Sequence, residues 1–140
     1  MNSLQICTFY LDDLYLGIEV TVVQEIVRFH KMTPVPLASP VISGLMNLRG
    51  QILTVIDLRK RFGLPAVSEN KSSMNVIVNT DGKPVSLLVD EIGDVIIMNP
   101  DCFEKPPDTL TGPAKDFFLG AYMLSEKLLL LLDIDKVMQF

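Results

Sequence analysis

Apolar and polar side chains alternate with a period of two along much of the chain, which is the pattern of half-buried β-strands. These segments come in pairs that are separated by short polar or glycine-containing turns. Four hairpins are predicted, at Gln5–Leu11 with Leu14–Ile18, Leu45–Leu48 with Ile52–Ile56, Met74–Asn79 with Val85–Val89, and Leu119–Leu124 with Leu128–Leu132. Their turns are Asp12-Asp13, Gly50-Gln51, Asp81-Gly82 and Ser125-Glu126. Short strands at this spacing favour small β-barrels over a parallel βαβ sheet.

Few and short helices are predicted, and each begins with an aspartate that can cap it. The first, Asp57–Phe62, stops at Gly63, and Asp133–Met138 repeats the design later in the chain. The three basic residues 59–61 of the first helix are expected to form a solvated face. Two proline-rich stretches, Lys31–Pro40 and Asn99–Pro113, are expected to be loops.

The sequence also contains an internal repeat. Early in the chain, residues match others 69 positions later, as Asp13 matches Gly82. Further on the offset is 76, as Gly44 matches Gly120. Each copy reads strand, turn, strand, acidic–aliphatic segment, proline-bearing loop, strand, turn, strand and capped helix, which indicates two similar lobes. Chance similarity among aliphatic strands is the alternative explanation.

Composition fits one folded domain built in this way. The 140 residues are 49% hydrophobic and 21% charged, which supplies a core and excludes a disordered tail, a collagen-like fibre and a low-complexity linker. We therefore expect a single domain over residues 1–140. Its two barrel lobes are placed at about residues 1–78 and 79–140, with an exchange of strands between them left open.

The charge is acidic and unevenly distributed. The formal net charge is −5, made up of +1 over residues 1–78 and −6 over residues 79–140. An acidic chain is a poor non-specific ligand for nucleic acid, because that binding depends on neutralising phosphates. No apolar run approaches the roughly 20 residues that span a bilayer, and the first residues lack signal-peptide features. We expect no direct membrane insertion and a cytoplasmic location.

Residues for catalysis or for binding a cofactor are mostly missing. Neither a phosphate-binding glycine loop nor a CxxC or HExxH pattern occurs, and one histidine, His30, excludes the usual histidine-rich zinc site. We therefore predict no metal, no cofactor and no enzyme activity. The alternative is nucleophilic chemistry by Cys7 or Cys102, which would require one of them to meet His30 in space.

The two copies of the repeat differ at one turn. Asn47–Gly50 in the first copy becomes Met123–Glu126 in the second. An arginine followed by glycine at a strand end presents a rigid cation with several donors, which suits a carboxylate or carbonyl of a partner. The alternative is that Arg49 forms an internal salt bridge.

Residues 41–59, VISGLMNLRGQILTVIDLR, resemble the signature of the CheW family of bacterial chemotaxis coupling proteins, G-x-x-N-L-R-G-x-I-x-P-x-I-D-L-R. Val23–Ile26 resembles the V-x-E-I segment of that family, Leu87–Ile96 its V-V-D-x-V-x-x-V stretch, and Leu131–Val137 its closing helix. Thr54 stands where the family usually has proline, a difference that concerns strand pairing.

The resemblance implies a mainly β fold of two SH3-like β-barrels packed together, with short helices. It also implies a scaffold without catalysis that joins the cytoplasmic tip of a chemoreceptor to the regulatory domain of the CheA histidine kinase. The receptor helices would lie in an apolar groove between the lobes. The contacts carried over by motif are Val23, Glu25, Ile26, Asn47 and Arg49. Glu25 and Arg49 could instead pair with each other and only shape the groove.

Three readings compete. The first is a free-standing coupling protein recruited to receptor arrays, which a start at Met1 and a last helix near Phe140 favour. The second is the CheW-like domain of a larger protein, a kinase regulatory domain or a CheV-type adaptor, or an adaptor of a pilus or biofilm pathway. The third is an unrelated enzyme. The first reading also predicts an exposed apolar patch, separate from the groove, for the kinase.

Overall fold

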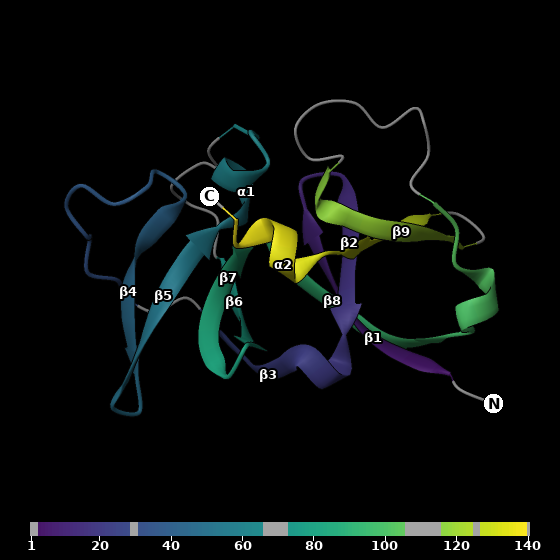
Figure 1. Cartoon of the computed structure of the whole chain (residues 1–140), viewed down its shortest axis with the longest axis horizontal. Helices are drawn as coiled ribbons and strands as arrows, with labels where there is room; N and C mark the ends of the chain where they lie inside the picture. Colours follow the sequence, from purple (N-terminus) through teal and green to yellow (C-terminus); the bar gives the residue numbers. More distant parts are fainter. Residues whose placement is uncertain (1–2, 29–30, 66–72, 106–115, 125–126, 140) are drawn as a thin grey trace.

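The structure is a computed structural model of the whole chain (Figure 1). It describes residues 3–28, 31–65, 73–105, 116–124 and 127–139. The predicted turn at Ser125-Glu126, the second half of the Asn99–Pro113 loop and His30 therefore lie outside the described residues.

The fold is mainly β, as the sequence predicts. In the part of the chain that the structure describes, the α-helices are α1 (Leu58–Arg61) and α2 (Ile134–Val137), and the 3₁₀ turns include η1 (Val20–Val22) and η2 (Pro100–Cys102). The strands are β1 (Leu4–Leu11), β2 (Leu14–Glu19), β3 (Val23–Arg28), β4 (Ile42–Leu48), β5 (Gln51–Asp57), β6 (Met74–Thr80), β7 (Lys83–Val89), β8 (Glu91–Met98), β9 (Phe118–Met123) and β10 (Leu128–Leu132).

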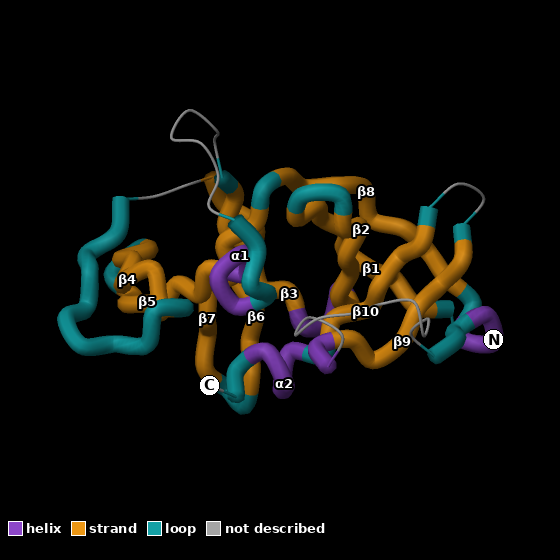
Figure 2. The backbone as a smooth tube through the Cα atoms, turned by 90° about the horizontal axis from the view of Figure 1, so that it is seen from above, coloured by secondary structure: helices purple, strands orange, loops and turns teal. Residues whose placement is uncertain are grey.

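The strands form two five-stranded sheets, one in each lobe. One sheet has the order β8-β1-β2-β10-β9 and is called the β1 lobe here; the other has the order β3-β6-β7-β5-β4 and is called the β5 lobe. The β5 lobe lies on the left and the β1 lobe on the right of Figure 1, with α2 between them. Viewed from above, the two lobes lie side by side along the long axis (Figure 2). Two similar SH3-like barrel lobes, the predicted fold class, are thereby confirmed.

The internal repeat is visible in the strand order. If β1–β5 are matched with β6–β10, the order of one sheet becomes the order of the other. The register of the strand pairs obeys the same repeat. In the parallel pair of β2 and β10, Leu16 is opposite Leu130. Their counterparts in the repeat, Val85 and Thr54, are opposite each other in the parallel pair of β7 and β5.

Each sheet nevertheless draws strands from both copies. The β1 lobe joins β1 and β2 to β8, β9 and β10, and the β5 lobe joins β6 and β7 to β3, β4 and β5. Parallel strands cannot be linked by a tight turn, so the partner comes from a distant part of the sequence. The lobes are consequently not the contiguous segments 1–78 and 79–140, and strands are exchanged between the copies.

Both predicted helices are present and capped by the predicted aspartates. The carboxylate of Asp57 accepts hydrogen bonds from the backbone N–H groups of Arg59 and Lys60 at 2.9 and 3.3 Å. The carboxylate of Asp133 accepts one from the N–H of Lys136 at 3.2 Å. These bonds satisfy donors that a helix N-terminus leaves unpaired.

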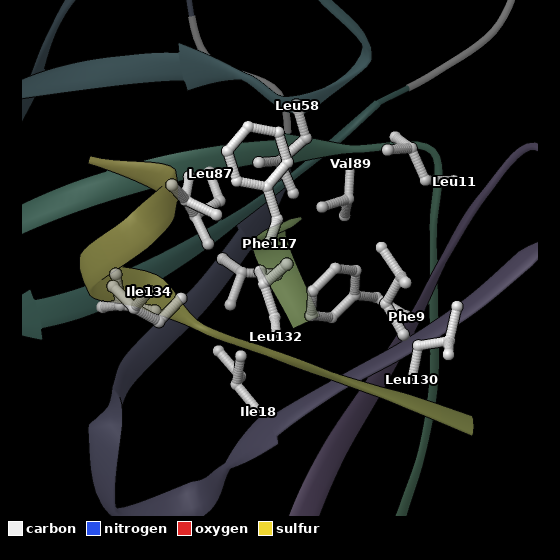
Figure 3. Packing of buried hydrophobic residues seen from close by; sticks show 14 of the residues in the cluster. Phe9, Leu11, Ile18, Leu58, Leu87, Val89, Phe117, Leu130, Leu132 and Ile134 are labelled. Carbon is white, nitrogen blue, oxygen red and sulfur yellow. The ribbon is translucent and has the colours of Figure 1, made fainter. Parts of the chain in front are cut away.

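The described apolar residues form three buried clusters, one inside each lobe and one between the lobes. Met46, Leu53 and Ile77 belong to the cluster inside the β5 lobe. Ile6, Tyr122, Leu129 and Leu131 fill the β1 lobe. The largest cluster lies between the lobes, and Figure 3 shows Phe117 and Leu132, on the side of the β1 lobe, between Phe9 of that lobe and Leu87 of the β5 lobe. Because this cluster contains residues of both lobes, the lobes share one core. Fully burying one such side chain contributes about 1.5–3 kcal/mol.

The prediction of a solvated face at residues 59–61 is wrong for Arg59. Its side chain is 8% exposed, whereas Lys60 is exposed. The reason is electrostatic: Asp12 and Asp90, both distant in sequence, form ion pairs with the Arg59 guanidinium and make its burial possible.

Candidate functional site

The predicted site residues Glu25 and Arg49 meet at one end of the β5 lobe. Arg49 donates from one terminal nitrogen to Glu25 Oε2 at 2.7 Å and from the other to Glu25 Oε1 at 2.5 Å. This two-bond fork is the strongest geometry for an arginine–carboxylate pair. The internal salt bridge that the sequence left open is therefore present.

The pair does not bury Arg49. Its side chain remains 71% exposed, while that of Glu25 is 23% exposed. The fork uses two of the five guanidinium N–H donors, and an exposed guanidinium has donors left for another molecule. Glu25 thus fixes the direction of Arg49 and leaves its outer face open to solvent.

The β4–β5 hairpin explains how Arg49 reaches this place (Figure 1). Leu48 pairs with Gln51, so Arg49 and Gly50 form a two-residue loop. Both have positive φ, 52° and 84°, as the common hairpin turn of this length requires. The side-chain oxygen of Asn47 accepts a hydrogen bond from the N–H of Gly50 at 3.0 Å, which closes the turn. The predicted residue Asn47 therefore positions the hairpin loop.

Arg49 occupies a conformation that its side chain does not favour. Glycine, asparagine and aspartate take left-handed backbone angles readily, whereas an arginine there is uncommon. Asp12 and Asp81, at φ 55° and 50°, follow that preference at the other two described hairpin turns. An unfavourable residue held by a dedicated carboxylate points to a requirement for the guanidinium itself.

The pair changes the ionisation of both groups. Hydrogen bonds from Arg49 lower the pKa of Glu25, against the opposing effect of desolvation. The same bonds, which the Glu25 carboxylate accepts, raise the pKa of Arg49. Both groups are thus kept charged.

Val23 and Ile26 lie on β3 in a different environment from the ion pair. Val23 is half-buried and packs against the core between the lobes. Ile26 is 37% exposed on the edge strand of the sheet. The pairing of β3 with β6 shifts register between Val23 and Glu25, so simple alternation does not assign their faces. Ile26 is thus the more accessible of the two predicted apolar residues, and the partner contacts expected of both stay predictions.

Sequence reasoning missed Ile52, an exposed apolar neighbour of this turn. Ile52 is opposite Asn47 in the β4–β5 ladder and is 59% exposed. Leu53 and Val55 on the same strand are fully buried. The alternation of β5 therefore contained the signal, because a residue next to Leu53 must face outward.

The equivalent place in the β1 lobe keeps an acidic residue and exposed apolar side chains but has serine in the sequence where Arg49 stands in the first copy. The repeat matches Glu25 with Asp94, Ile26 with Val95, and Asn47 with Met123. Val95 and Met123 are 56% and 68% exposed. The same lobe also exposes Ile97 on β8 and Leu119 on β9. The predicted apolar surface outside the charged site thus has candidates on β8 and β9.

A pocket of about 380 Å³ lies where the lobes meet, away from the predicted residues. Its lining includes Ile18 and Glu19 at the end of β2, the β6–β7 turn at Asp81, and the start of α2 at Asp133 and Asp135. None of Val23, Glu25, Ile26, Asn47 and Arg49 is part of that lining. The pocket is partly apolar and partly acidic.

The environment of Cys7 does not favour thiol chemistry. Burial raises the pKa of the Cys7 thiol, which disfavours the nucleophilic thiolate. Within the described parts of the chain, no three His, Cys, Asp or Glu side chains are placed to hold a metal ion. No described helix has the length and apolar character needed to cross a membrane.

Comparison with known proteins agrees with this picture. The sequence model of the CheW-like domain matches residues 5–140. The chemotaxis protein CheW of Treponema pallidum is 30% identical over 97% of this chain and 82% of its own length. CheW of Klebsiella aerogenes is also 30% identical, over 93% and 78%. The crystal structure of the scaffolding protein TtCheW from Thermoanaerobacter tengcongensis superposes with a TM-score of 0.88 at 30% identity, covering 99% of this chain and 94% of that one.

Proposed function

The chain belongs to the CheW-like family, and we propose that it couples the cytoplasmic tips of chemoreceptors to the regulatory domain of the histidine kinase CheA. The family consists of non-catalytic adaptors, so the chain is a chemotaxis scaffold and not an enzyme. Its place of action is the cytoplasm, at membrane-associated receptor arrays. Its function is to assemble other proteins, so the property to be explained is how its surfaces recognise these partners.

The observation that carries the proposal is the Glu25–Arg49 fork. An exposed guanidinium, 71% accessible and already aimed by a carboxylate, loses little side-chain freedom when a partner binds. Arginine is also enriched among the residues that dominate binding energy at interfaces. Ile26 and Ile52, the accessible apolar side chains of β3 and β5, supply contacts that a charged residue alone lacks.

The receptor is proposed to bind at this charged surface, defined as Glu25, Ile26, Asn47, Arg49 and Ile52. A receptor tip is helical, and helices are bound through apolar anchors together with a few oriented polar contacts. The kinase is proposed to bind exposed apolar side chains of the β1 lobe, which are Val95 and Ile97 on the edge strand β8 and Leu119 and Met123 on the opposite edge strand β9. Exposed apolar side chains of this kind mark interaction sites on proteins.

The test reverses the charge of Arg49. Arg49→Glu places two carboxylates where a fork now stands and removes the cation offered to the receptor. We expect binding of a receptor-tip fragment to weaken by about tenfold or more, the scale of interface residues that dominate affinity. Binding of the isolated CheA regulatory domain should change far less. Both affinities are measured by titration calorimetry.

Lys60→Glu is the matched control, because Lys60 is an exposed basic residue that carries the same change of charge. It should leave both affinities close to those of the parent protein. If Arg49→Glu binds the receptor fragment as the parent does, the charged surface is not the receptor site.

A further inference from the structure

Arg59 stands at the centre of a buried charged cluster. Its Nε donates to Asp90 Oδ1 at 2.9 Å, and a terminal nitrogen donates to Asp90 Oδ2 at 2.6 Å. The same terminal nitrogen also pairs with Asp12, and the other donates to the carbonyl of Pro65 at 2.7 Å. The side chains of Arg59 and Asp90 are 8% and 12% exposed. The Asp90 carboxylate further accepts a hydrogen bond from the N–H of Asp12 at 2.8 Å.

The members of this cluster come from both lobes. Arg59 lies on α1, which follows β5 in the β5 lobe, and Asp12 lies in the β1–β2 turn of the β1 lobe. Asp90 is the single residue between β7 and β8, where the chain crosses from one lobe to the other. One guanidinium therefore holds each lobe and the connection between them.

A second arginine of the same helix also reaches across. The Nε of Arg61 donates to the carbonyl of Val137 in α2 at 2.7 Å, and a terminal nitrogen donates to the carbonyl of Lys136 at 3.1 Å. Backbone carbonyls at a helix end accept from many directions, whereas the Asp90 carboxylate receives a fork of fixed geometry. The Arg59 cluster is thus the more directional of the two ties.

The repeat shows that the cluster is present on one side of the molecule. The other crossing between the lobes is η1, and the repeat matches Thr21 there with Asp90. It also matches Asp81 with Asp12, and Asp135 with Arg59. Among the described residues, no hydrogen bond or ion pair joins Thr21, Asp81 and Asp135. One crossing is therefore fixed by a charged cluster and the other is not.

Buried ion pairs and apolar contacts contribute differently to a fold. Burying charges costs desolvation energy, and replacing a buried ion pair by apolar residues often leaves stability unchanged or increases it. The apolar core between the lobes supplies stability, but apolar attraction has little directionality. A fork of hydrogen bonds has strict directionality.

We propose that Arg59, with Asp90 and Asp12, is a positioning cluster that fixes the angle between the two lobes and so sets the spacing of the surfaces on either lobe. The test below measures the distance between the lobes, which is independent of the proposed function, and the affinity for a receptor-tip fragment, which rests on it. We predict that loss of the cluster changes the angle between the lobes more than it changes the stability of the protein.

The decisive variant is the double substitution Arg59→Met with Asp90→Leu, which removes the two buried charges together. Asp12 loses its ion pair in this variant, but its side chain is 41% exposed and its carboxylate can be hydrated. Spin labels are attached to cysteines introduced at Gln5 on β1 and Gln51 on β5, which are exposed. The exposed Cys102 is replaced by serine, while Cys7 is buried. The distance distribution between the labels is measured by pulsed electron–electron double resonance, and Tm is measured by calorimetry.

We expect a distance distribution that is broader than that of the parent or displaced from it, at a Tm within a few degrees of the parent value. Affinity for a receptor-tip fragment should fall by about tenfold, as for residues that modulate binding from a distance. Lys60→Met, a change on the same helix at an exposed residue, should leave the distances as they are. Arg59→Lys keeps the charge but loses the fork, and should give an intermediate width.

An unchanged distance distribution in the double variant and in Arg59→Lys would overturn the proposal. The same conclusion follows if both variants only lower Tm. If the double variant does not fold, Arg59→Lys alone decides by its distances. Should the parent protein fail to bind the receptor fragment, the proposed function fails while the distance result still tests the positioning cluster.

Discussion

The β4–β5 strand pair of the β5 lobe and the β9–β10 pair of the β1 lobe share one register, and the places beside them carry different chemistry. The first has the ion pair of Glu25 and Arg49, whereas the second has Asp94 and Ser125 at the matching positions of the sequence. The second also exposes Met123, which matches Asn47. Since the repeat gives both places the same strand order and register, folding requirements do not explain the difference. What differs between the copies is therefore the best guide to what each surface contacts.

The crossings between the lobes repeat this lesson. Asp90 is bound by Arg59 at one crossing, while the repeat puts Thr21 and Asp135 at the other. Duplicated folds make such internal controls possible, because each residue has a counterpart in a similar environment. The predictions below use these counterparts.

The largest effect should come from weakening the β5 lobe alone. Ile77→Ala removes a fully buried side chain from the cluster inside that lobe and should cost about 2–5 kcal/mol. Because the lobes exchange strands and share a core, both should unfold together. Tyr10, Tyr15 and Tyr122 all lie in the β1 lobe, so tyrosine fluorescence reports on the lobe that was not changed.

Thermal transitions followed by tyrosine fluorescence and by far-UV circular dichroism should then coincide at one lowered Tm. A tyrosine transition that stays at the parent Tm would show that the lobes are independent units.

A smaller effect should separate the two helix caps. Asp57→Ala removes two capping bonds and Asp133→Ala removes one, and each should cost about 0.5–2 kcal/mol. We expect the larger loss for Asp57→Ala, measured by urea denaturation at equal m-value. Equal losses, or a larger one for Asp133→Ala, would contradict the comparison of the caps.

The smallest effect should be the pH dependence of the exposed ion pair. Hydrogen bonds from Arg49 lower the pKa of Glu25 in the folded protein, so the pair stabilises the fold fully above the pKa of Glu25 in the unfolded chain. That contribution is lost as the pH falls through the folded-state pKa. The Tm difference between the parent and Glu25→Gln should therefore be positive near neutral pH and shrink in acid.

Asp94→Asn is the matched variant, because the repeat places Ser125 where an arginine would be needed. Its Tm difference from the parent should be smaller near neutral pH. A Glu25→Gln difference that grows on acidification would contradict the stabilising role of the pair.

The sequence predicted local features well because local residues determine them. Asp57 and Asp133 cap helices through bonds to residues two or three positions away, and the repeat offsets located the copies. Glu25 and Arg49, 24 residues apart, were found only because a family motif contains both, and their pairing was one of two alternatives.

What the sequence did not reveal depends on long-range topology. Arg59 was expected on a solvated face, but its partners Asp90 and Asp12 are 31 and 47 residues away, and strand exchange brings them together. The register shift in β3 likewise places Val23 and Ile26, three residues apart, opposite Val78 and Val76, which lie on one face of β6. A local pattern does not contain either fact.

The most direct test of the two-surface account compares Ile26→Asp with Val95→Asp, which the repeat places at equivalent positions. Each variant replaces an exposed apolar side chain of its lobe by a charged one. The affinities for a receptor-tip fragment and for the CheA regulatory domain are measured in parallel. We predict that Ile26→Asp weakens receptor binding by about 2 kcal/mol and leaves kinase binding nearly unchanged, and that Val95→Asp does the reverse. Equal loss of both partners in both variants would contradict the account, because it would mean a single shared site.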